Sequence, residues 1–295
     1  MQRIGLSTGS LYESLVGETA TRLAAAALSH LPLASYTATS RILDSACGPG
    51  IVSKLLLSPS PPYVSVPGLP VSTAAPPRVT GIDISPSMLE QYTANARTLG
   101  WATSESYTQD SQDLSRFSDG VFDAVVMNIG IFALEDAVTG TREMHRVLKP
   151  GGHAVVTTWK TRRPQQIMNR AAEAIHPRGE GKQVMDIDLK WMTGEHLVNV
   201  MVDGGFGQGN VGLSETAPNW TFDSPDALLG ALSSPMWTSQ FCKGWSEEEK
   251  ARWTDEVARQ LTDEERASCS LEMVAFVCVA QKEGDRWVSS SYGRF

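Results

Sequence analysis

Four polar side chains in the first half of the chain each end a short segment that predicts a β-strand. They are Asp44, Asp83, Asp110 and Asn128. A carboxylate at the end of a strand can accept hydrogen bonds from a ribose diol or an amino group, and it can bind a cation. A fifth predicted strand ends in an aromatic side chain, Trp159. Because parallel strands end at one edge of a sheet, these residues predict a ligand site there.

A turn of small residues follows Asp44 and leads into an apolar segment with helical spacing. The turn is Ala46-Cys47-Gly48-Pro49-Gly50, and the segment covers residues 51–57. A backbone with few side chains can approach a ligand closely, and the start of a helix offers free N–H groups. Glycine-rich turns of this kind also occur as plain connectors. From the turn alone, a nucleotide site and a simple connection are both open.

The composition is typical of a globular protein with one large domain, or with one domain and an insertion. The chain has 295 residues, of which 41% are hydrophobic and 20% are charged. Its net charge of −8 and its lack of basic runs argue against a nucleic-acid partner. No apolar run has the length of a membrane span, and residues 1–5 lack the apolar core of a signal peptide. We therefore expect a small-molecule substrate and no membrane.

Four scattered cysteines indicate the compartment. Cys47, Cys242, Cys269 and Cys278 form no CxxC pair, which predicts free thiols in a reducing compartment and no metal site. We expect a cytoplasmic protein that is a monomer or a homodimer.

Predicted strands alternate with predicted helices, which indicates an α/β fold with a parallel, doubly wound sheet. We expect a Rossmann-like, mostly parallel sheet of seven strands, with a helical cap inserted after strand five. The segment Phe122–Asn128 is apolar almost throughout, as a strand buried on both faces should be. The predicted strands cover residues 41–44, 79–83, 106–110, 122–128, 153–159, part of 211–222, and 271–280. The predicted helices cover residues 9–31, 51–57, 85–99, 134–148, 164–175, 193–203, 224–232 and 246–261.

The chain is predicted to divide into four segments. Residues 1–40 form a helical segment that covers the ligand site, and residues 41–160 form the core, with a Pro-rich loop at 58–77. Residues 161–283 hold the helical cap and the last two strands, and residues 284–295 are a tail. Two interpretations are open for Tyr12, which either packs or covers the ligand. The same holds for the cap aromatics Trp237, Phe241, Trp245 and Trp253, which form either a packing core or a ligand wall.

The three acidic strand ends describe the ligand more closely. Asp83 ends the second strand, where an acid usually binds a ribose diol. The turn lacks the GxGxxG pattern of a dinucleotide site, and Asp110 with Ser111 can accept a hydrogen bond from an adenine amino group. Asp44 can receive a cationic amine. A ligand with an amine, a ribose diol and an adenine is S-adenosylmethionine.

Four ordered motifs resemble the class I S-adenosylmethionine-dependent methyltransferases over residues 41–159. They are D-x-A-C-G-P-G, G-I-D-I-S-P-S-M-L, F-D-A-V-V-M-N and R-V-L-K-P-G-G. The resemblance implies S-adenosylmethionine as cofactor and S-adenosylhomocysteine as product. The family's first motif glycine is Ala46 here, and we expect this small change to preserve binding. The implied cofactor residues are Tyr12, Asp44, Ala46, Cys47, Gly48 and Gly50 at the methionine part, Asp83 at the ribose, Ile84, Met88, Asp110 and Ser111 at the adenine, and Asn128 and Ile129 on the other side.

The rest of the chain resembles, more loosely, fungal methyltransferases of secondary metabolism. The similarity is to thiol S-methyltransferases that cap dithiol diketopiperazines of the gliotoxin type, through Tyr12, Gly17, Thr158-Trp159, Trp191 and residues 245–248. It implies methyl transfer to a small molecule, with a thiol favoured and O- or N-methylation possible. A second hypothesis is a methyltransferase-fold protein that binds the cofactor but catalyses another reaction or plays a regulatory role.

No side chain in the sequence stands out as a general base. A sulfonium is already an activated electrophile, so positioning and exclusion of water can suffice, and a thiolate forms readily near neutral pH. His176 and His196 lie in the cap and could reach the substrate, whereas His145 and His153 are expected to be structural, and His30 ends the first predicted helix. The predicted substrate-lining residues are Tyr12, Trp159, His176, His196, Trp237, Phe241 and Trp245.

Overall fold

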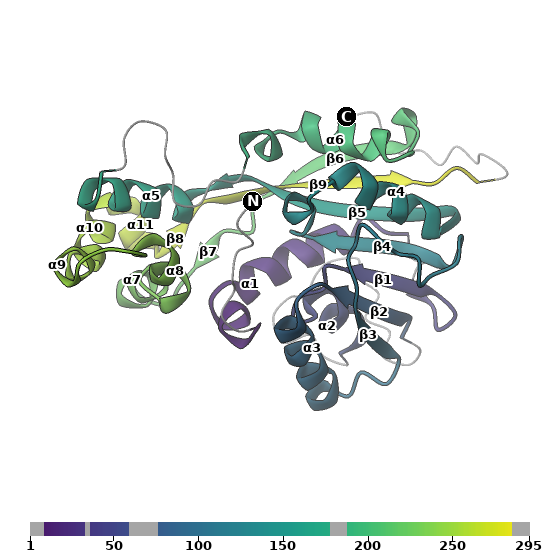
Figure 1. The fold of residues 1–295 in the computed structure, drawn as a ribbon, viewed down its shortest axis with the longest axis horizontal. Helices are drawn as coiled ribbons and strands as arrows, with labels where there is room; N and C mark the ends of the chain where they lie inside the picture. Colours follow the sequence, from purple (N-terminus) through teal and green to yellow (C-terminus); the bar gives the residue numbers. More distant parts are fainter. Residues whose placement is uncertain (1–8, 33–35, 59–75, 178–187, 285–295) are drawn as a thin grey trace.

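A seven-stranded sheet, in the order β3-β2-β1-β4-β5-β9-β6, forms the centre of the protein (Figure 1). The computed structural model describes residues 9–32, 36–58, 76–177 and 188–284. Neighbouring strands from β3 to β5 are parallel, and β9 runs antiparallel to both β5 and β6. The predicted mostly parallel, seven-stranded Rossmann-like sheet is confirmed. The strands are β1 (Arg41–Ser45), β2 (Arg78–Asp83), β3 (Ser104–Thr108), β4 (Phe122–Asn128), β5 (Leu148–Arg162), β6 (Val211–Thr216) and β9 (Met273–Gln281), with β7 (Trp220–Thr221) and β8 (Ser270–Leu271) in a separate two-stranded ladder.

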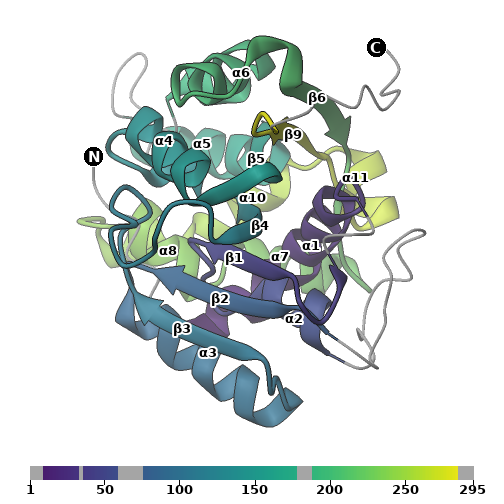
Figure 2. The same cartoon turned by 90° about the vertical axis from the view of Figure 1, so that its right-hand side faces the viewer.

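Two hydrophobic clusters cover the two faces of the sheet. Ile42 and Val126 belong to the cluster on one face, and Leu43 and Val125 belong to the other, because alternate side chains of a strand point to opposite faces. Figure 2 shows α1, α2 and α3 on one side of the sheet and α4 and α6 on the other. The helices are α1 (Gly9–Leu28), α2 (Ile51–Leu57), α3 (Pro86–Leu99), α4 (Ala137–Val147) and α6 (Gly194–Asp203), with short 3-10 helices η2 (Ile131–Ala133), η3 (Leu189–Met192) and η4 (Gln208–Asn210).

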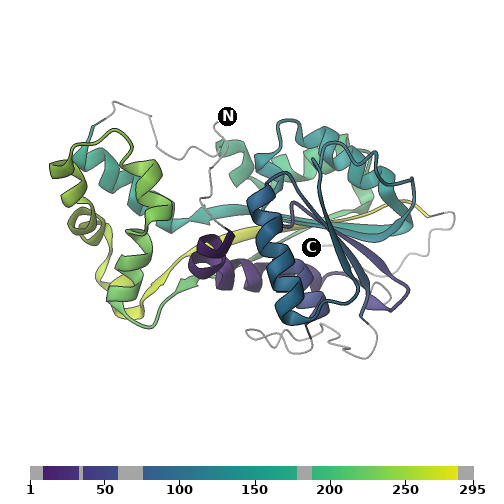
Figure 3. The ribbon, with the colours of Figure 1, turned by 60° about the horizontal axis from the view of Figure 1, so that its bottom comes forward.

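A helical lobe lies beyond the sheet, at the far end of two long strands. β5 and β9 extend past their neighbours and lead into this lobe (Figures 1 and 3). It consists of α5 (Arg163–Ile175), α7 (Pro225–Leu232), α8 (Pro235–Phe241), α9 (Glu247–Ala251), α10 (Trp253–Gln260) and α11 (Asp263–Ser268). Its place after strand five is the place where the sequence predicts a helical cap.

Several helices and strands begin or end at other residues than predicted. The helix predicted at 246–261 is two helices that part at Arg252, and a capping box between Ser246 and Glu249 starts the first of them. β3 ends at Thr108, so Asp110 lies in the following loop. α8 and α11 are short helices that the periodicity did not predict. Most of the Pro-rich loop 58–77 and all but the first residue of the tail 284–295 lie outside the described residues.

Within the described ranges, no helix combines the length and the apolar character needed to cross a bilayer.

Candidate functional site

Two strained turns meet at the carboxyl edge of the sheet. Ala46, after β1, has a φ of 54°, and Ile129, after β4, has a φ of 62°. This left-handed conformation costs a residue with a side chain about 1–2 kcal/mol. The turns also touch, because a Cβ atom at Gly130 would lie 2.8 Å from the Cβ of Ala46. Strained backbone of this kind is concentrated at functional sites, which marks this edge as the candidate site.

Asp83 joins the β1 turn to the start of α3. Its Oδ2 accepts a hydrogen bond from the Gly48 N–H at 2.9 Å, and its Oδ1 accepts one from the Ser85 N–H at 2.8 Å. Burial raises the pKa of this carboxyl group. A carboxylate has about four acceptor sites, so each oxygen retains capacity for one hydroxyl of a diol.

Asp44 lies in the protein interior, with 1% of its surface exposed. Its Oδ2 accepts hydrogen bonds from the Ser53 N–H at 3.1 Å and the Ser53 Oγ at 2.7 Å, and Tyr92 donates to that Oγ at 3.1 Å. Burial raises the pKa of Asp44 to about 7. In this structure Asp44 holds α2 against β1, so it positions the turn. Sequence reasoning missed Ser53, which looks like an ordinary helical residue.

The two glycines of the turn have different reasons to be glycine. Gly48 has a φ of 53°, and among the described residues no atom beyond its two chain neighbours lies within 4 Å of a Cβ at this position, so its backbone borders open space. A Cβ at Gly50 would lie 2.7 Å from Tyr92 and 3.0 Å from Trp101. Gly50 is therefore required by packing, whereas Gly48 fits close approach of a ligand. Cys47 lies between Ala46 and Gly48 and is buried. Its N–H donates to the Ile82 carbonyl at 2.8 Å.

The loop after β3 carries the residues expected at the adenine. Asp110 accepts hydrogen bonds at Oδ1 from the Gln112 N–H at 2.9 Å and from Gln112 Nε2 at 3.1 Å. Ser111 is buried and accepts from the Ser45 hydroxyl at 2.9 Å. Ile84 is 47% exposed, so its side chain offers an apolar surface to a flat ring. Met88 is buried in α3.

Thr157 on β5 fixes the end of β4. Its Oγ1 donates to Asn128 Oδ1 at 2.9 Å and accepts from the Ile129 N–H at 2.9 Å. Asn128 Nδ2 donates in turn to the Ala20 carbonyl of α1 at 3.2 Å. The predicted pair Asn128 and Ile129 therefore lies at the same edge as Ala46, under α1. Thr157 is a positioning residue that the sequence did not reveal.

α1 covers the turn through Glu13. Its carboxylate pairs with Lys54 Nζ of α2 at 3.2 Å and accepts from Asn95 Nδ2 of α3 at 3.0 Å. Asn95 also donates to the Pro49 carbonyl at 2.9 Å. Tyr12 lies in α1 next to Glu13, but its side chain lies outside the described part of the chain.

The cap aromatics form the interior of the helical lobe. Phe241 is completely buried, with its ring centroid 5.5 Å from that of Trp253, and Trp245 lies 5.9 Å from the same ring. Trp237 is 7% exposed. Packing is therefore the role that these contacts support, and Phe241 presents no surface to a substrate. Trp159 on β5 is also nearly buried.

The two cap histidines lie in different places. His176 follows α5, whose 13 residues separate it from β5 by about 20 Å. It contacts Glu249 Oε1 through Nδ1 at 2.7 Å and stacks on Trp245. His196 packs edge-on against Trp191 at 4.5 Å, and burial lowers its pKa. Trp191 lies beside β5, since its carbonyl accepts from Thr158 Oγ1 at 3.4 Å. His196 thus lies beside β5, through Trp191, whereas His176 lies in the helical lobe.

The other three histidines have local structural partners. His145 packs against Phe206 at 4.9 Å, and His30 contacts Ser214 Oγ at 3.2 Å. His153 is buried in β5, where it pairs with Gln281, and burial lowers its pKa. The contacts of His145 and His153 fit the structural role expected from the sequence, and His30 follows the end of α1.

Residues 43–156 match the protein family described as "Methyltransferase domain", a match to less than half of the chain. A curated relative from Geotalea uraniireducens, "Ubiquinone/menaquinone biosynthesis C-methyltransferase UbiE", is 30% identical over 128 residues, which are 43% of this chain and 49% of the relative. A "Demethylmenaquinone methyltransferase" from Bacteroides fragilis is 35% identical over 81 residues, 28% of this chain and 33% of the relative. The chain thus spans about half or less of the length of these relatives. They are bacterial and lend no support to the expected closeness to fungal enzymes, which stays a prediction.

Two solved structures have a similar fold. Haemonchus contortus phosphoethanolamine N-methyltransferase 2, in complex with phosphomonomethylethanolamine and S-adenosylhomocysteine, aligns with a TM-score of 0.52 at 15% identity, over 96% of this chain and 58% of that chain. The [4+2]-cyclase SpnF aligns with a TM-score of 0.51 at 18% identity, over 90% of this chain and 81% of that chain. The chain therefore has the Rossmann-like fold of the methyltransferases, and residues 43–156 of it match the methyltransferase domain family.

Proposed function

We propose that this protein is an S-adenosylmethionine-dependent methyltransferase that acts on a small-molecule acceptor. The observation that carries the proposal is Asp83, whose carboxylate ties the open turn at Gly48 to the start of α3 at the edge of the sheet. The strained turns at Ala46 and Ile129, which meet at this edge, support it. The match of residues 43–156 to the methyltransferase domain family supports the same reaction class.

The residues at this edge fit the proposed cofactor. Asp83 has acceptor capacity for the ribose hydroxyls, the Gly48 backbone borders open space, and Ile84 offers an exposed apolar surface to the adenine. When bound, S-adenosylmethionine would supply a methyl group on a positively charged sulfur. The buried Asp44 would hold the turn in place through Ser53.

The proposed role of the protein in catalysis is to hold the acceptor in line and to exclude water. Asn128 and Ile129, fixed by Thr157, would line the methyl side, with α1 above them. A thiol of a secondary metabolite is the acceptor that the sequence resemblance favours. O- and N-methylation are alternatives, and the names of the curated relatives add C-methylation of a quinone precursor.

The segment boundaries 1–40, 41–160, 161–283 and 284–295 are proposed as functional divisions, with the helical lobe as the cap over the acceptor. A cytoplasmic location and a monomeric or homodimeric state remain part of this proposal. The net charge of −8 supports a small molecule over a nucleic acid as acceptor.

A second candidate function is a cofactor-binding protein that catalyses another reaction. The specific observation in its favour is the fold similarity to a [4+2]-cyclase, because one fold can host unrelated reactions. Incubation with methyl-labelled S-adenosylmethionine and a panel of thiols, phenols, amines and hydroquinones separates the two. Label in an acceptor supports methyl transfer. Binding of S-adenosylhomocysteine with no labelled acceptor supports the second candidate.

The histidines test catalysis by positioning. We expect His176→Ala and His196→Ala each to change turnover by less than about tenfold, because neither has an acid–base role in this account. A loss of about a thousandfold with cofactor binding intact would assign a general base and contradict the proposal.

A further inference from the structure

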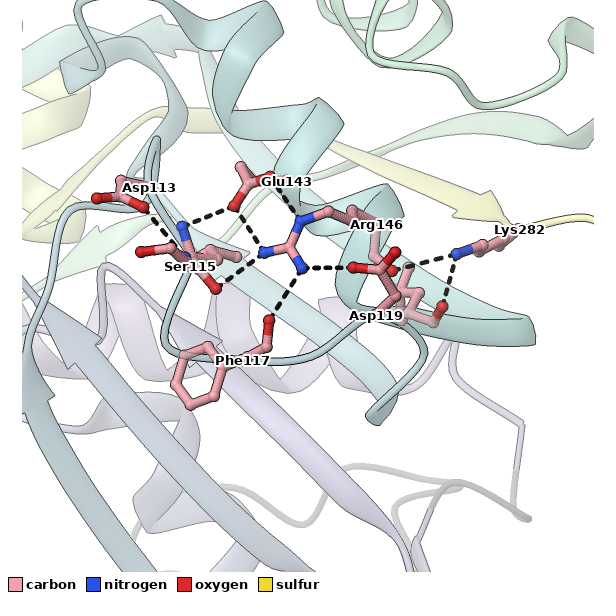
Figure 4. Close-up of polar contacts among 9 residues, drawn as sticks. Asp113, Ser115, Phe117, Asp119, Glu143, Arg146 and Lys282 are labelled. Carbon is pink, nitrogen blue, oxygen red and sulfur yellow. Dashed lines mark hydrogen bonds and ion pairs between the residues drawn. The ribbon is translucent and has the colours of Figure 1, made fainter.

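Arg146, near the end of α4, makes a half-buried network with the loop that follows β3 (Figure 4). Its Nη2 donates to the Leu114 carbonyl at 2.8 Å, and its Nη1 donates to the Phe117 carbonyl at 2.9 Å. The same Nη1 pairs with Asp119 Oδ1 at 2.7 Å. Three contacts from one guanidinium thus fix the backbone and one side chain of this loop.

Glu143 completes the network from the same helix. Its two carboxylate oxygens pair with Nε and Nη2 of Arg146, each at 2.8 Å. Its Oε2 also accepts the Leu114 N–H at 2.7 Å, so both backbone groups of Leu114 are bound by this pair. The side chains of Arg146 and Glu143 are 28% and 19% exposed. A bidentate ion pair that is buried to this extent is stronger than a pair on the surface.

The other end of α4 holds the loop at a second point. Gln112 Oε1 accepts from the Asp136 N–H at 2.6 Å, at the residue that caps α4. Gln112 Nε2 donates to Asp110 Oδ1 at 3.1 Å. The loop that carries Asp110 and Ser111 is therefore held to α4 both beside these residues and at Leu114.

We propose that Arg146, with Glu143, is a positioning residue for the adenosine half of the cofactor, because it holds the loop that carries Asp110 and Ser111. This inference rests on the proposed function. Neither residue touches the strand-end carboxylates, so the effect runs through the loop alone. Without the guanidinium, the Leu114 and Phe117 carbonyls lose their charged donor, and the loop gains freedom that cofactor binding must remove again.

The test compares Arg146→Lys and Arg146→Met with Lys149→Met as the control. Lysine keeps the positive charge but cannot form the bidentate pair with Glu143. Lys149 also makes a partly exposed ion pair at 2.7 Å nearby, but with Asp123 and not with the loop. Binding of S-adenosylhomocysteine and of 5′-methylthioadenosine, which carries only the adenosine half, is measured by calorimetry at a temperature where all variants are folded.

We expect the Arg146→Lys substitution to weaken binding of both ligands by a similar factor of about ten, and the Lys149→Met substitution to change it less than twofold. Turnover at saturating cofactor should change less than about threefold, because the substitution affects cofactor binding.

A lower melting temperature with unchanged affinity for both ligands would show that Arg146 is a purely structural residue and would overturn the inference. If Arg146→Met does not fold, Arg146→Lys decides the outcome. Failure of the wild-type protein to bind S-adenosylhomocysteine would instead overturn the proposed function.

Discussion

The carboxyl edge of the sheet and the interior of the helical lobe both hold residues that the sequence predicts to line a site, but these residues differ in burial and in their contacts. At the edge, Asp83 accepts from the backbone N–H groups of Gly48 and Ser85, and Asn128 donates to the Ala20 carbonyl of α1, and both border the candidate site. In the lobe, Phe241 and Trp253 pack on each other and are almost fully buried. Left-handed backbone at residues with a side chain occurs in both regions, at Ala46 and Ile129 at the edge and at Cys269 at the end of α11 in the lobe. The contrast teaches that polar residues with remaining hydrogen-bond capacity mark the site better than a cluster of aromatics.

Truncation of Phe241 should have the largest effect and should be confined to stability. Phe241→Ala removes a completely buried ring, and we expect it to lower the free energy of unfolding by about 3–5 kcal/mol. Affinity of the folded protein for S-adenosylhomocysteine should stay within about twofold, because the lobe interior lies away from the edge. Urea unfolding and calorimetry check the two parts. A raised KM for the acceptor with unchanged stability would restore the substrate-wall interpretation.

The pH dependence of stability tests the buried carboxylate at the edge. Because burial raises the pKa of Asp44 to about 7, the folded state binds a proton that the unfolded state releases near its ordinary value of 3.8. The free energy of unfolding therefore falls as pH rises through this window.

Asp44→Asn keeps an acceptor for Ser53 and removes this titration. Between about pH 5 and pH 8 we expect the variant to gain on the order of 2–3 kcal/mol relative to the wild type. Urea unfolding at the two pH values provides the measurement. A difference between the two proteins that is the same at both pH values would contradict the raised pKa.

Neutralisation of Asp83 should affect binding far more than stability. Asp83→Asn halves the acceptor capacity at the proposed ribose position, and we expect S-adenosylhomocysteine to bind about 100-fold more weakly, roughly 2.7 kcal/mol. Asp123→Asn is the matched control. Asp123 also accepts a hydrogen bond from a backbone N–H, that of Arg41 at 2.8 Å, but it lies at the opposite edge of the sheet. Equal affinities for the two variants would remove Asp83 from the site.

Replacement of Ala46 should give the smallest effect, with a favourable sign. Ala46→Gly relieves the left-handed strain, and we expect a stabilisation of up to about 1 kcal/mol. Ala24→Gly in the buried face of α1 should instead destabilise by about 1 kcal/mol or more. Melting temperatures that move in the same direction for both variants would show that the turn at Ala46 is not strained.

The sequence predicts the sheet well because its signals are local. The apolar run Phe122–Asn128, for example, indicates a buried strand within seven residues. The positioning residues depend on contacts over long sequence separations and could not be predicted in this way. Ser53 serves Asp44, and Thr157 serves Asn128, only once β1, α2, β4 and β5 are assembled. In the lobe, packing and ligand walls select the same aromatic residues, so Phe241 remained ambiguous until its burial was known.

The most direct test of the central claim is a thermal-shift comparison of S-adenosylhomocysteine with NAD on the wild-type protein. A ligand at about 100 times its Kd stabilises the folded state by about 2.7 kcal/mol, which a melting curve detects readily. We predict that S-adenosylhomocysteine raises the melting temperature, that NAD does not, and that the Asp83→Asn variant loses most of the shift. Stabilisation by NAD alone, or an undiminished shift in Asp83→Asn, would contradict the account.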